Sequence, residues 1–458
     1  MEHALKVGVS GVRGIVGESF TPQVGAAFAQ AFGTFLGGGS VVIGRDPRPS
    51  GIMVEYAVTA GLRSVGCHPI CLGITPTPTL LIATTALGAQ GGIAITASHN
   101  PSPWNALKFV GGNGRFLNPA RVEELTDLYH QGNFPFVPEE ELPSLSQHGE
   151  AFQTHLQRIQ QVVDIQSIRA CRFKVAIDCC NGVGALYSPD FLQKTLGCEI
   201  VPLFDQATGL FEREPEPRAE NLTALCQAVV DHKCDIGFAQ DPDGDRLAIV
   251  NERGEPIGED FTLAFAVRQV LEHHCKGPTA LNLSTSKCVE QVARDLGSEV
   301  IRTPIGEVNV TEAMIEAGAV VGGEGSGGVI VPAIHPCRDS YAAMALTLEL
   351  MAATRQTVSA LRAAMPHFEL VRENVPLQPE QAPALLRRLR WHYKNQKIDL
   401  RDGVYVDFGD SWIHVRRSNT EPIIRLAAEA PTKKQAQQLM QELRGLVKTG
   451  SGNAAEAK

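Results

Sequence analysis

The sequence of 458 residues lacks the long hydrophobic runs of a membrane protein. No apolar stretch reaches the roughly 18 residues that are needed to span a bilayer. The first residues also lack the basic segment and apolar stretch of a secretion signal. We therefore expect a cytoplasmic protein.

Paired cysteines and excess positive charge are also missing. The 11 cysteines include no C-x-x-C pair, and Cys179 and Cys180 are adjacent, a spacing that suits neither a disulfide nor a zinc site. We expect these cysteines to be small buried hydrophobic residues. The net charge of −9 argues against nucleic acid or an anionic membrane as the main partner. If such a protein binds phosphate, it has to gather arginines or backbone N–H groups locally.

The chain does contain alternating short β-rich runs and helical segments, a pattern typical of α/β domains. Residues 41–44 and 92–95 are such runs, and residues 51–65 between them have helical spacing. The last part differs, because residues 404–408 and 412–415 alternate like hairpin strands around a turn at residues 409–411.

Proline-rich and charged segments at residues 134–149 and 371–383 are the expected joints between domains. We predict three similar α/β domains with mixed, largely parallel sheets and a smaller C-terminal α+β domain, arranged around a central cleft. The predicted bounds are 1–150, 151–255, 256–370 and 371–448, and residues 449–458 are predicted to be a disordered tail.

Three aspartates alternate in one short loop that follows an apolar strand. Asp241, Asp243 and Asp245 can direct three oxygens at one point, and oxygen is the ligand type that Mg²⁺ prefers. Arg246 could pair with a phosphate. An EF-hand calcium loop is disfavoured, because its sixth position needs glycine and Arg246 stands there. An acidic surface turn remains the alternative.

The apolar run at residues 91–97 leads into Ser98. On a loop, this hydroxyl could act as a nucleophile or carry a phosphate, or it could only cap a turn. A serine hydrolase is disfavoured, because no G-x-S-x-G elbow occurs and adjacent Ser98 and His99 would point apart on a strand.

A glycine-rich turn and several arginine-rich segments complete the candidate site. Glu324 and Ser326, in the turn at residues 322–328, could bind neighbouring sugar hydroxyls. This turn lacks the P-loop lysine and the G-x-G-x-x-G spacing of nucleotide-binding loops. Arginines gather around Arg13, at residues 44–49 and at residues 416–425. The last segment could cradle an anion, and a solvated basic turn is the alternative.

Together these segments resemble the α-D-phosphohexomutase family over essentially the whole chain, and within it phosphoglucosamine mutases of the archaeal type. The matching motifs are TASHNP at 96–101, DPDGDR at 241–246, GEGSGG at 323–328 and RRSNTEP at 416–422, with SGVRG and GRDPRPSG near the N-terminus.

The resemblance implies that Ser98 becomes a phosphoserine and that Mg²⁺ is held by its phosphate and the three aspartates. The enzyme would interconvert glucosamine 6-phosphate and glucosamine 1-phosphate through a bisphosphorylated sugar, with hexose 1,6-bisphosphate as activator. Lys108 would be the general acid or base, its pKa lowered towards neutrality by burial near cations. An exposed surface lysine is the alternative.

The resemblance also assigns the other site residues. Arg13 and His99 would support the phosphoserine, and Arg246 would offset charge on the transferring group. Glu324 and Ser326 would bind the sugar. The phosphate that is not reacting would be held by Arg416, Ser418, Asn419, Thr420 and Arg425.

The identity of the sugar rests on two positions. Phosphomannomutase/phosphoglucomutases usually carry histidine at the position of Gly328 and often at that of Glu307, so glucosamine is favoured and these enzymes are the alternative.

A metal-dependent phosphatase and a non-catalytic phosphosugar-binding protein are the other hypotheses. The expected partner is a small-molecule sugar phosphate, and the fourth domain is expected to swing in when it binds. The sequence predicts no oligomeric state.

Overall fold

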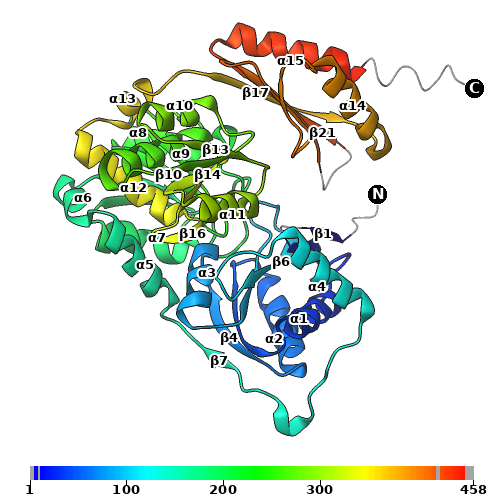
Figure 1. Cartoon of the computed structure of the whole chain (residues 1–458). Helices are drawn as coiled ribbons and strands as arrows, with labels where there is room; N and C mark the ends of the chain where they lie inside the picture. Colours follow the sequence, from blue (N-terminus) through cyan, green and yellow to red (C-terminus); the bar gives the residue numbers. More distant parts are fainter. Residues whose placement is uncertain (1–4, 9–10, 419–422, 449–458) are drawn as a thin grey trace, which may run out of the picture.

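The computed structural model describes residues 5–8, 11–418 and 423–448, and in them four sheets follow one another along the chain (Figure 1). The predicted tail at residues 449–458 lies outside these ranges, as do Asn419 and Thr420. None of the helices in the described ranges combines the length and apolar character of a membrane span.

The first domain is built on a seven-stranded sheet of order β1-β2-β6-β5-β3-β4-β7. Strands β5, β3, β4 and β7 pair in parallel, and the other side of the sheet is antiparallel. The strands are β1 Lys6–Gly8, β2 Gly11–Ile15, β3 Gly39–Arg45, β4 Cys67–Ile74, β5 Gly91–Ile95, β6 Trp104–Gly111 and β7 Ser146–Gln147. The helices are α1 Pro22–Leu36, α2 Gly51–Ser64, α3 Thr77–Ala86 and α4 Pro119–Gln131. The predicted helix and its two flanking strands are thus confirmed.

The second domain has a four-stranded sheet of order β11-β10-β8-β9, with only β11 antiparallel. Its strands are β8 Lys174–Asp178, β9 Glu199–Leu203, β10 Ile236–Gln240 and β11 Leu247–Asn251. The helices before and within it are α5 Ala151–Val162, α6 Ile165–Cys171, α7 Gly184–Asp190 and α8 Thr223–His232.

The third domain has a five-stranded sheet of order β13-β12-β14-β15-β16, parallel as far as β14 and antiparallel beyond it. Its strands are β12 Thr279–Asn282, β13 Val300–Thr303, β14 Val321–Glu324, β15 Gly328–Val331 and β16 His335–Arg338. Its helices are α9 Glu259–Gln269, α10 Lys287–Asp295, α11 Glu307–Ala317, α12 Ser340–Thr354 and α13 Val358–Ala363. The second and third domains share one hydrophobic core, crossed by α9 and α12.

The C-terminal domain has a wholly antiparallel sheet of order β17-β21-β20-β19-β18. The predicted hairpin is confirmed as β19 and β20, in which Val404 pairs with Val415. The elements are β17 Glu369–Pro376, α14 Ala382–His392, β18 Lys397–Asp399, β19 Val404–Asp407, β20 Trp412–Arg417, β21 Ile423–Ala430 and α15 Lys433–Lys448. The predicted fold class, three α/β domains with mixed sheets and a C-terminal α+β domain, is confirmed.

The C-terminal domain packs against the third domain, and Figure 1 shows it far from α1 and α2 of the first. Tyr405, Trp412 and Ala427 form a small apolar cluster with Leu283. Beside this cluster, the carboxylate of Glu429 accepts from Trp412 Nε1 at 2.6 Å and from the backbone N–H of Lys287 at 2.7 Å. The last domain is therefore fixed to the third by a buried, hydrogen-bonded interface.

The cysteines are free thiols, and most of them are buried, as expected; Cys275 is exposed. Burial raises the pKa of Cys180 to about 12, which keeps the thiol protonated and unreactive.

Candidate active site

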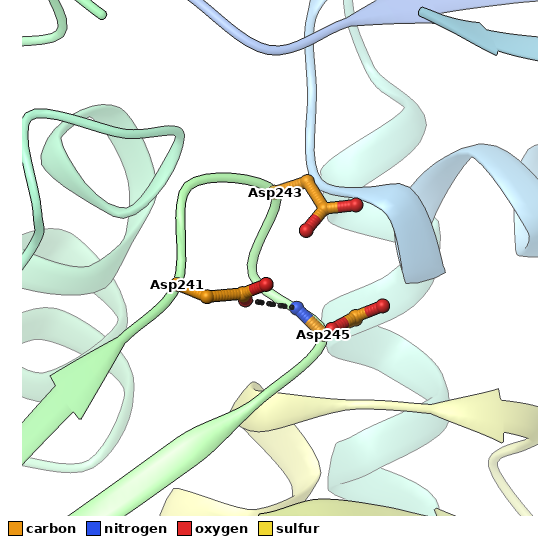
Figure 2. Close-up of side chains that lie close together, drawn as sticks. All are labelled: Asp241, Asp243 and Asp245. Atoms are coloured by element: carbon orange, nitrogen blue, oxygen red, sulfur yellow. Dashed lines mark hydrogen bonds between the residues drawn. The ribbon is translucent and has the colours of Figure 1, made fainter. Parts of the chain in front are cut away.

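The three alternating aspartates lie in the turn of the β10–β11 hairpin. All three are buried, and one oxygen from each lies within 4.8 Å of the others. Figure 2 shows Asp241, Asp243 and Asp245 around one loop, with the Asp241 carboxylate accepting from the backbone N–H of Asp245 at 3.1 Å. The alternation predicted from the sequence thus gathers three carboxylates at one point.

Two oxygens of this cluster fit a divalent cation. Asp243 Oδ1 and Asp245 Oδ1 are buried and have no hydrogen-bond donor among the described residues. A buried, unsatisfied carboxylate oxygen costs free energy that a metal ion would recover. Because all the candidate ligands are carboxylate oxygens, the site suits a hard cation such as Mg²⁺.

The cluster is also electrostatically crowded. Burial raises the pKa of Asp241 well above its usual range, and the neighbouring charges of Asp245 and Asp243 raise it further. Burial acts in the same direction on Asp243, but the Lys108 ammonium and hydrogen bonds from neighbouring side chains together outweigh it and hold the pKa of Asp243 below its usual range. Carboxylates that repel one another in a buried site favour a cation between them.

Ser98 meets this cluster across the boundary between the first and second domains. Its Oγ donates to Asp241 Oδ2 at 3.0 Å, although 143 residues separate the two. Ser98 has a φ of 50°, in the left-handed region, which costs a non-glycine residue about 1 kcal/mol. Such strain persists only where the surrounding structure enforces it, which is common at functional sites.

A buried arginine enforces this conformation. Arg48 donates to four carbonyl oxygens of the serine loop at 2.6 to 3.2 Å; these belong to Ser98, Asn100, Pro101 and Trp104. Its Nε pairs with Asp46 at 2.9 Å, and Asp46 also accepts from Thr96 at 2.6 Å. The arginines at residues 44–49 therefore have internal partners, since Arg45 pairs with Glu55 at 2.7 Å. Their positive charge is thus offset within the first domain.

Lys108 reaches the same cluster from β6. The side chain is buried, and its Nζ lies 2.7 Å from Asp243 Oδ2, so the exposed-lysine alternative is wrong. Burial acts to lower the pKa of Lys108, but the charges of Asp243 and Asp245 outweigh it and the pKa lies above its ordinary value. The expected lowering towards neutrality is therefore wrong, because the nearest charges are carboxylates rather than cations.

His99 lies beside the serine hydroxyl. Its Nδ1 is 3.2 Å from Ser98 Oγ, so the expectation that these side chains point apart is wrong. The reason is the left-handed backbone at Ser98, which ends the strand geometry. Burial, with Arg246 and Arg338 adding to it, lowers the pKa of His99 well below its usual value. Arg13 also adjoins the loop, with its guanidinium 3.4 Å from Asn100 Oδ1.

The glycine-rich turn is joined to the aspartate loop by Arg338, which the sequence analysis missed. Arg338 donates to Asp245 Oδ2 at 2.6 Å and to Glu324 Oε2 at 2.9 Å, and its Nε lies 3.1 Å from Glu307 Oε2. Ser326 lies in the turn between β14 and β15. One sequence signal could have indicated Arg338. It belongs to a charged Arg–Asp pair, residues 338 and 339, that stands directly before the apolar helix α12.

Arg246 and two arginines of the C-terminal domain are the candidates for binding an anion. Arg246 donates to Glu216 at 3.2 Å, and its buried Nε has no hydrogen-bond acceptor among the described residues. Arg416 and Arg425 stand opposite each other on β20 and β21. Burial and the charge of Arg425 lower the pKa of Arg416, while the charges of Asp402 and, less strongly, Glu324 act against this. Like charges placed directly opposite favour an anion between them.

Comparisons with known proteins agree with this geometry. The chain matches the four successive domain models of phosphoglucomutase/phosphomannomutase: α/β/α domains I, II and III over residues 4–135, 153–254 and 258–368, and the C-terminal domain over residues 373–446.

Individual relatives cover the whole chain. A probable phosphoglucosamine mutase of Methanopyrus kandleri is 36% identical over 96% of this chain and 97% of its own. A phosphoglucomutase/phosphomannomutase of Thermococcus kodakarensis is 34% identical over 95% and 96%. The crystal structure of a phosphoglucomutase/phosphomannomutase family protein from Burkholderia thailandensis superimposes with a TM-score of 0.85 at 26% identity, covering 97% of both chains. The chain therefore belongs to the phosphoglucomutase/phosphomannomutase family of phosphohexomutases.

Proposed function

We propose that the chain interconverts glucosamine 6-phosphate and glucosamine 1-phosphate, with Ser98 carrying the phosphate as a phosphoserine. The observation that carries this proposal is the contact between Ser98 Oγ and Asp241 Oδ2 at 3.0 Å. This contact sets a buried hydroxyl beside a carboxylate cluster of another domain. The probable phosphoglucosamine mutases among the relatives support glucosamine as the sugar.

The cofactor that suits this site is Mg²⁺, held by Asp241, Asp243, Asp245 and the phosphate on Ser98. When bound, the ion supplies positive charge that offsets charge on the transferring phosphoryl group. Arg246, whose buried Nε lies 3.8 Å from Asp245 Oδ1 and has no hydrogen-bond acceptor among the described residues, adds a guanidinium for the same group.

The reaction transfers a phosphoryl group from Ser98 to the sugar and then returns one from the sugar to Ser98. The phosphoryl group leaves Ser98 Oγ for a sugar hydroxyl oxygen, that hydroxyl gives up its proton, and Oγ takes one up. The bisphosphorylated sugar then turns over and returns its other phosphoryl group to Ser98. We assign the sugar proton to Lys108 as general acid and base. Because the charges of Asp243 and Asp245 hold the pKa of Lys108 above its ordinary value, its role as base requires a bound cation that offsets these two charges. His99 and Arg13 support the serine loop, and a hexose 1,6-bisphosphate acts as activator by phosphorylating Ser98.

The rest of the substrate is bound by two further loops. Glu324 and Ser326 take the sugar hydroxyls. The phosphate that is not reacting is held by Arg416, Ser418, Asn419, Thr420 and Arg425. Two opposed guanidiniums suit a dianion better than one does, because each offsets part of its charge.

Substitution of the serine tests the proposal. Interconversion is assayed with Mg²⁺ and catalytic glucose 1,6-bisphosphate for the wild type, Ser98→Ala and the matched control Ser102→Ala. Ser102 lies in the same loop, where its hydroxyl donates to Gly209 O at 3.2 Å. We expect Ser98→Ala to lose mutase activity by about 1000-fold or more and Ser102→Ala to keep it. Undiminished mutase activity in Ser98→Ala, or steady release of inorganic phosphate in place of isomerisation, would overturn the proposal.

A phosphomannomutase/phosphoglucomutase is the second candidate, favoured by the Thermococcus kodakarensis relative of that name. The two candidates differ in the ratio of kcat/KM for glucosamine, glucose and mannose phosphates. A strong preference for mannose phosphate would replace the first candidate by the second.

A further inference from the structure

One guanidinium in the site is shared by three carboxylates. Arg338, on β16, contacts Asp245 at 2.6 Å, Glu324 at 2.9 Å and Glu307 at 3.1 Å. All four side chains are nearly excluded from solvent. Asp245 belongs to the metal cluster, so a bound cation would offset its charge. Among the described residues, the recorded ion pairs of both glutamates are then with this one guanidinium.

The two glutamates differ in their remaining capacity to accept hydrogen bonds. Glu324 Oε1 already accepts from Asn282 Nδ2 and from the backbone N–H of Gly306, both at 2.9 Å. Glu307 Oε1 accepts from the backbone N–H of Arg338 at 2.9 Å, and Oε2 faces Arg338 Nε. A carboxylate oxygen can accept two hydrogen bonds, so Glu307 keeps room for a donor on each oxygen.

The charge of Glu307 is also the less well compensated. Burial raises the pKa of Glu307 to about 7, and Asp245 adds to the rise, although Arg338 opposes it. Burial acts on Glu324 as well, but there Arg338 and Asn282 outweigh it and the pKa is lowered. A cation placed beside Glu307 would therefore recover more electrostatic free energy than one placed beside Glu324.

We propose that Glu307 selects an aminosugar phosphate by accepting a hydrogen bond from the ammonium group of the sugar. The proposal deepens the proposed function and rests on it, because the sugar is placed at Glu324, one guanidinium away. An ammonium group supplies both a donor and the missing positive charge. A sugar hydroxyl supplies only the donor, and hydrogen bonds between charged groups are about twice as strong as neutral ones.

Paired binding measurements test this. Dissociation constants for glucosamine 6-phosphate and glucose 6-phosphate are measured by calorimetry with Mg²⁺ for the wild type, Glu307→Gln, Glu307→Asp and the control Glu316→Gln. Glu316 lies on the same helix, α11, and is exposed. We expect Glu307→Gln to lower the preference for the amino sugar at least about 10-fold, Glu307→Asp to retain part of it and Glu316→Gln to leave it unchanged.

The contrary outcomes are distinct. If Glu307→Gln weakens both sugars equally, or changes neither, Glu307 has only a structural role and the inference is wrong. If Glu307→Gln melts well below the wild type, the result for Glu307→Asp decides. This variant keeps the carboxylate charge, so it must prefer glucosamine 6-phosphate to glucose 6-phosphate more strongly than Glu307→Gln does; otherwise the inference is wrong. The inference can fail while Ser98-dependent mutase activity persists; loss of the proposed function instead appears as an absence of that activity in the wild type.

Discussion

At the scale of single residues, the serine loop depends on a charged group that is buried beneath it. Arg48 is 1% exposed and donates to several carbonyl oxygens of the loop that presents Ser98. Carbonyl oxygens that turn towards the protein interior need donors there, and Arg48 supplies them. The positive charge is in turn offset by Asp46. The strained conformation of Ser98 is thus maintained by a buried ion pair below the loop.

The first prediction concerns this ion pair. Arg48→Met leaves Asp46 as an unpaired buried charge and leaves the loop carbonyls without donors. We expect a loss of about 3 kcal/mol or more of stability and a misplaced Ser98 hydroxyl. Melting temperature and phosphate incorporation at Ser98 measure the two effects.

The control is Arg45→Met, in the same motif. Arg45 pairs with Glu55 and is 15% exposed, so its loss should cost about 1 kcal/mol or less. Equal melting temperatures for the two variants would show that Arg48 does not hold the loop.

At the scale of elements, the carboxylate cluster of Asp241, Asp243 and Asp245 is formed by one hairpin. Strands β10 and β11 pair from Ile236 with Asn251 to Gln240 with Leu247, so the six residues between them must reverse the chain. Gly244 has a φ of 72°, which glycine adopts without strain. The turn therefore directs its aspartates to one side, at the end of strands buried in the core of the second domain.

The second prediction follows from the crowding of these carboxylates. Asp241→Asn removes one of three like charges and keeps an acceptor for the backbone N–H groups of Asp245 and Arg246. We expect the metal-free protein to become more stable and its stabilisation by Mg²⁺ to be largely lost. Melting curves with EDTA and with Mg²⁺ measure both effects. The control, Asp231→Asn on the exposed face of α8, should change neither.

A second connection between elements runs from the sugar loop to β20. Asn282 holds Glu324, and the backbone N–H of Ser284 donates to Asn282 Oδ1 at 3.0 Å. Ser284 Oγ lies 2.8 Å from Nδ1 of His414, two residues before Arg416 on β20. His414 Nε2 must donate to the carbonyl of Asp402 at 2.6 Å, so Nδ1 accepts from the serine while the ring is neutral. This chain of hydrogen bonds connects β20, which carries Arg416, to Asn282, which donates to Glu324 in β14.

At the scale of the whole molecule, the C-terminal domain is fixed to the third domain, whereas Ser98 lies in the first. The contacts of the C-terminal domain with the third domain combine an apolar cluster with buried polar contacts, such as that between Glu429 and the N-terminus of α10. Movement of the C-terminal domain towards Ser98 would therefore pivot on this interface.

The third prediction is that such a movement accompanies binding. A bisphosphorylated sugar carries charge at both ends, so it can attract Arg416 and Arg425 while its other phosphate lies at Ser98. We expect the radius of gyration from small-angle X-ray scattering to fall when glucose 1,6-bisphosphate and Mg²⁺ are added. Glucose, which has no phosphate, should leave the scattering profile unchanged. Identical profiles with and without the bisphosphate would contradict the closure.

The sequence by itself determined the local parts of this protein. Alternating Asp241, Asp243 and Asp245 after an apolar strand were enough to predict a carboxylate cluster, because residues of one tight turn cannot lie far apart. The alternating α/β pattern and the C-terminal hairpin were predictable for the same reason, since periodicity reflects which face of an element is buried.

Only the tertiary structure decided which distant groups meet. The contact of Ser98 with Asp241 joins two domains, and the partners of Arg48 and Arg338 come from separate strands and loops. The pKa of Lys108 was mispredicted because its direction depends on the sign of the nearest charges, and these come from another domain. The relative positions of residues in one turn are thus determined by local geometry, whereas the pKa values of the site residues are determined by the packing of the domains.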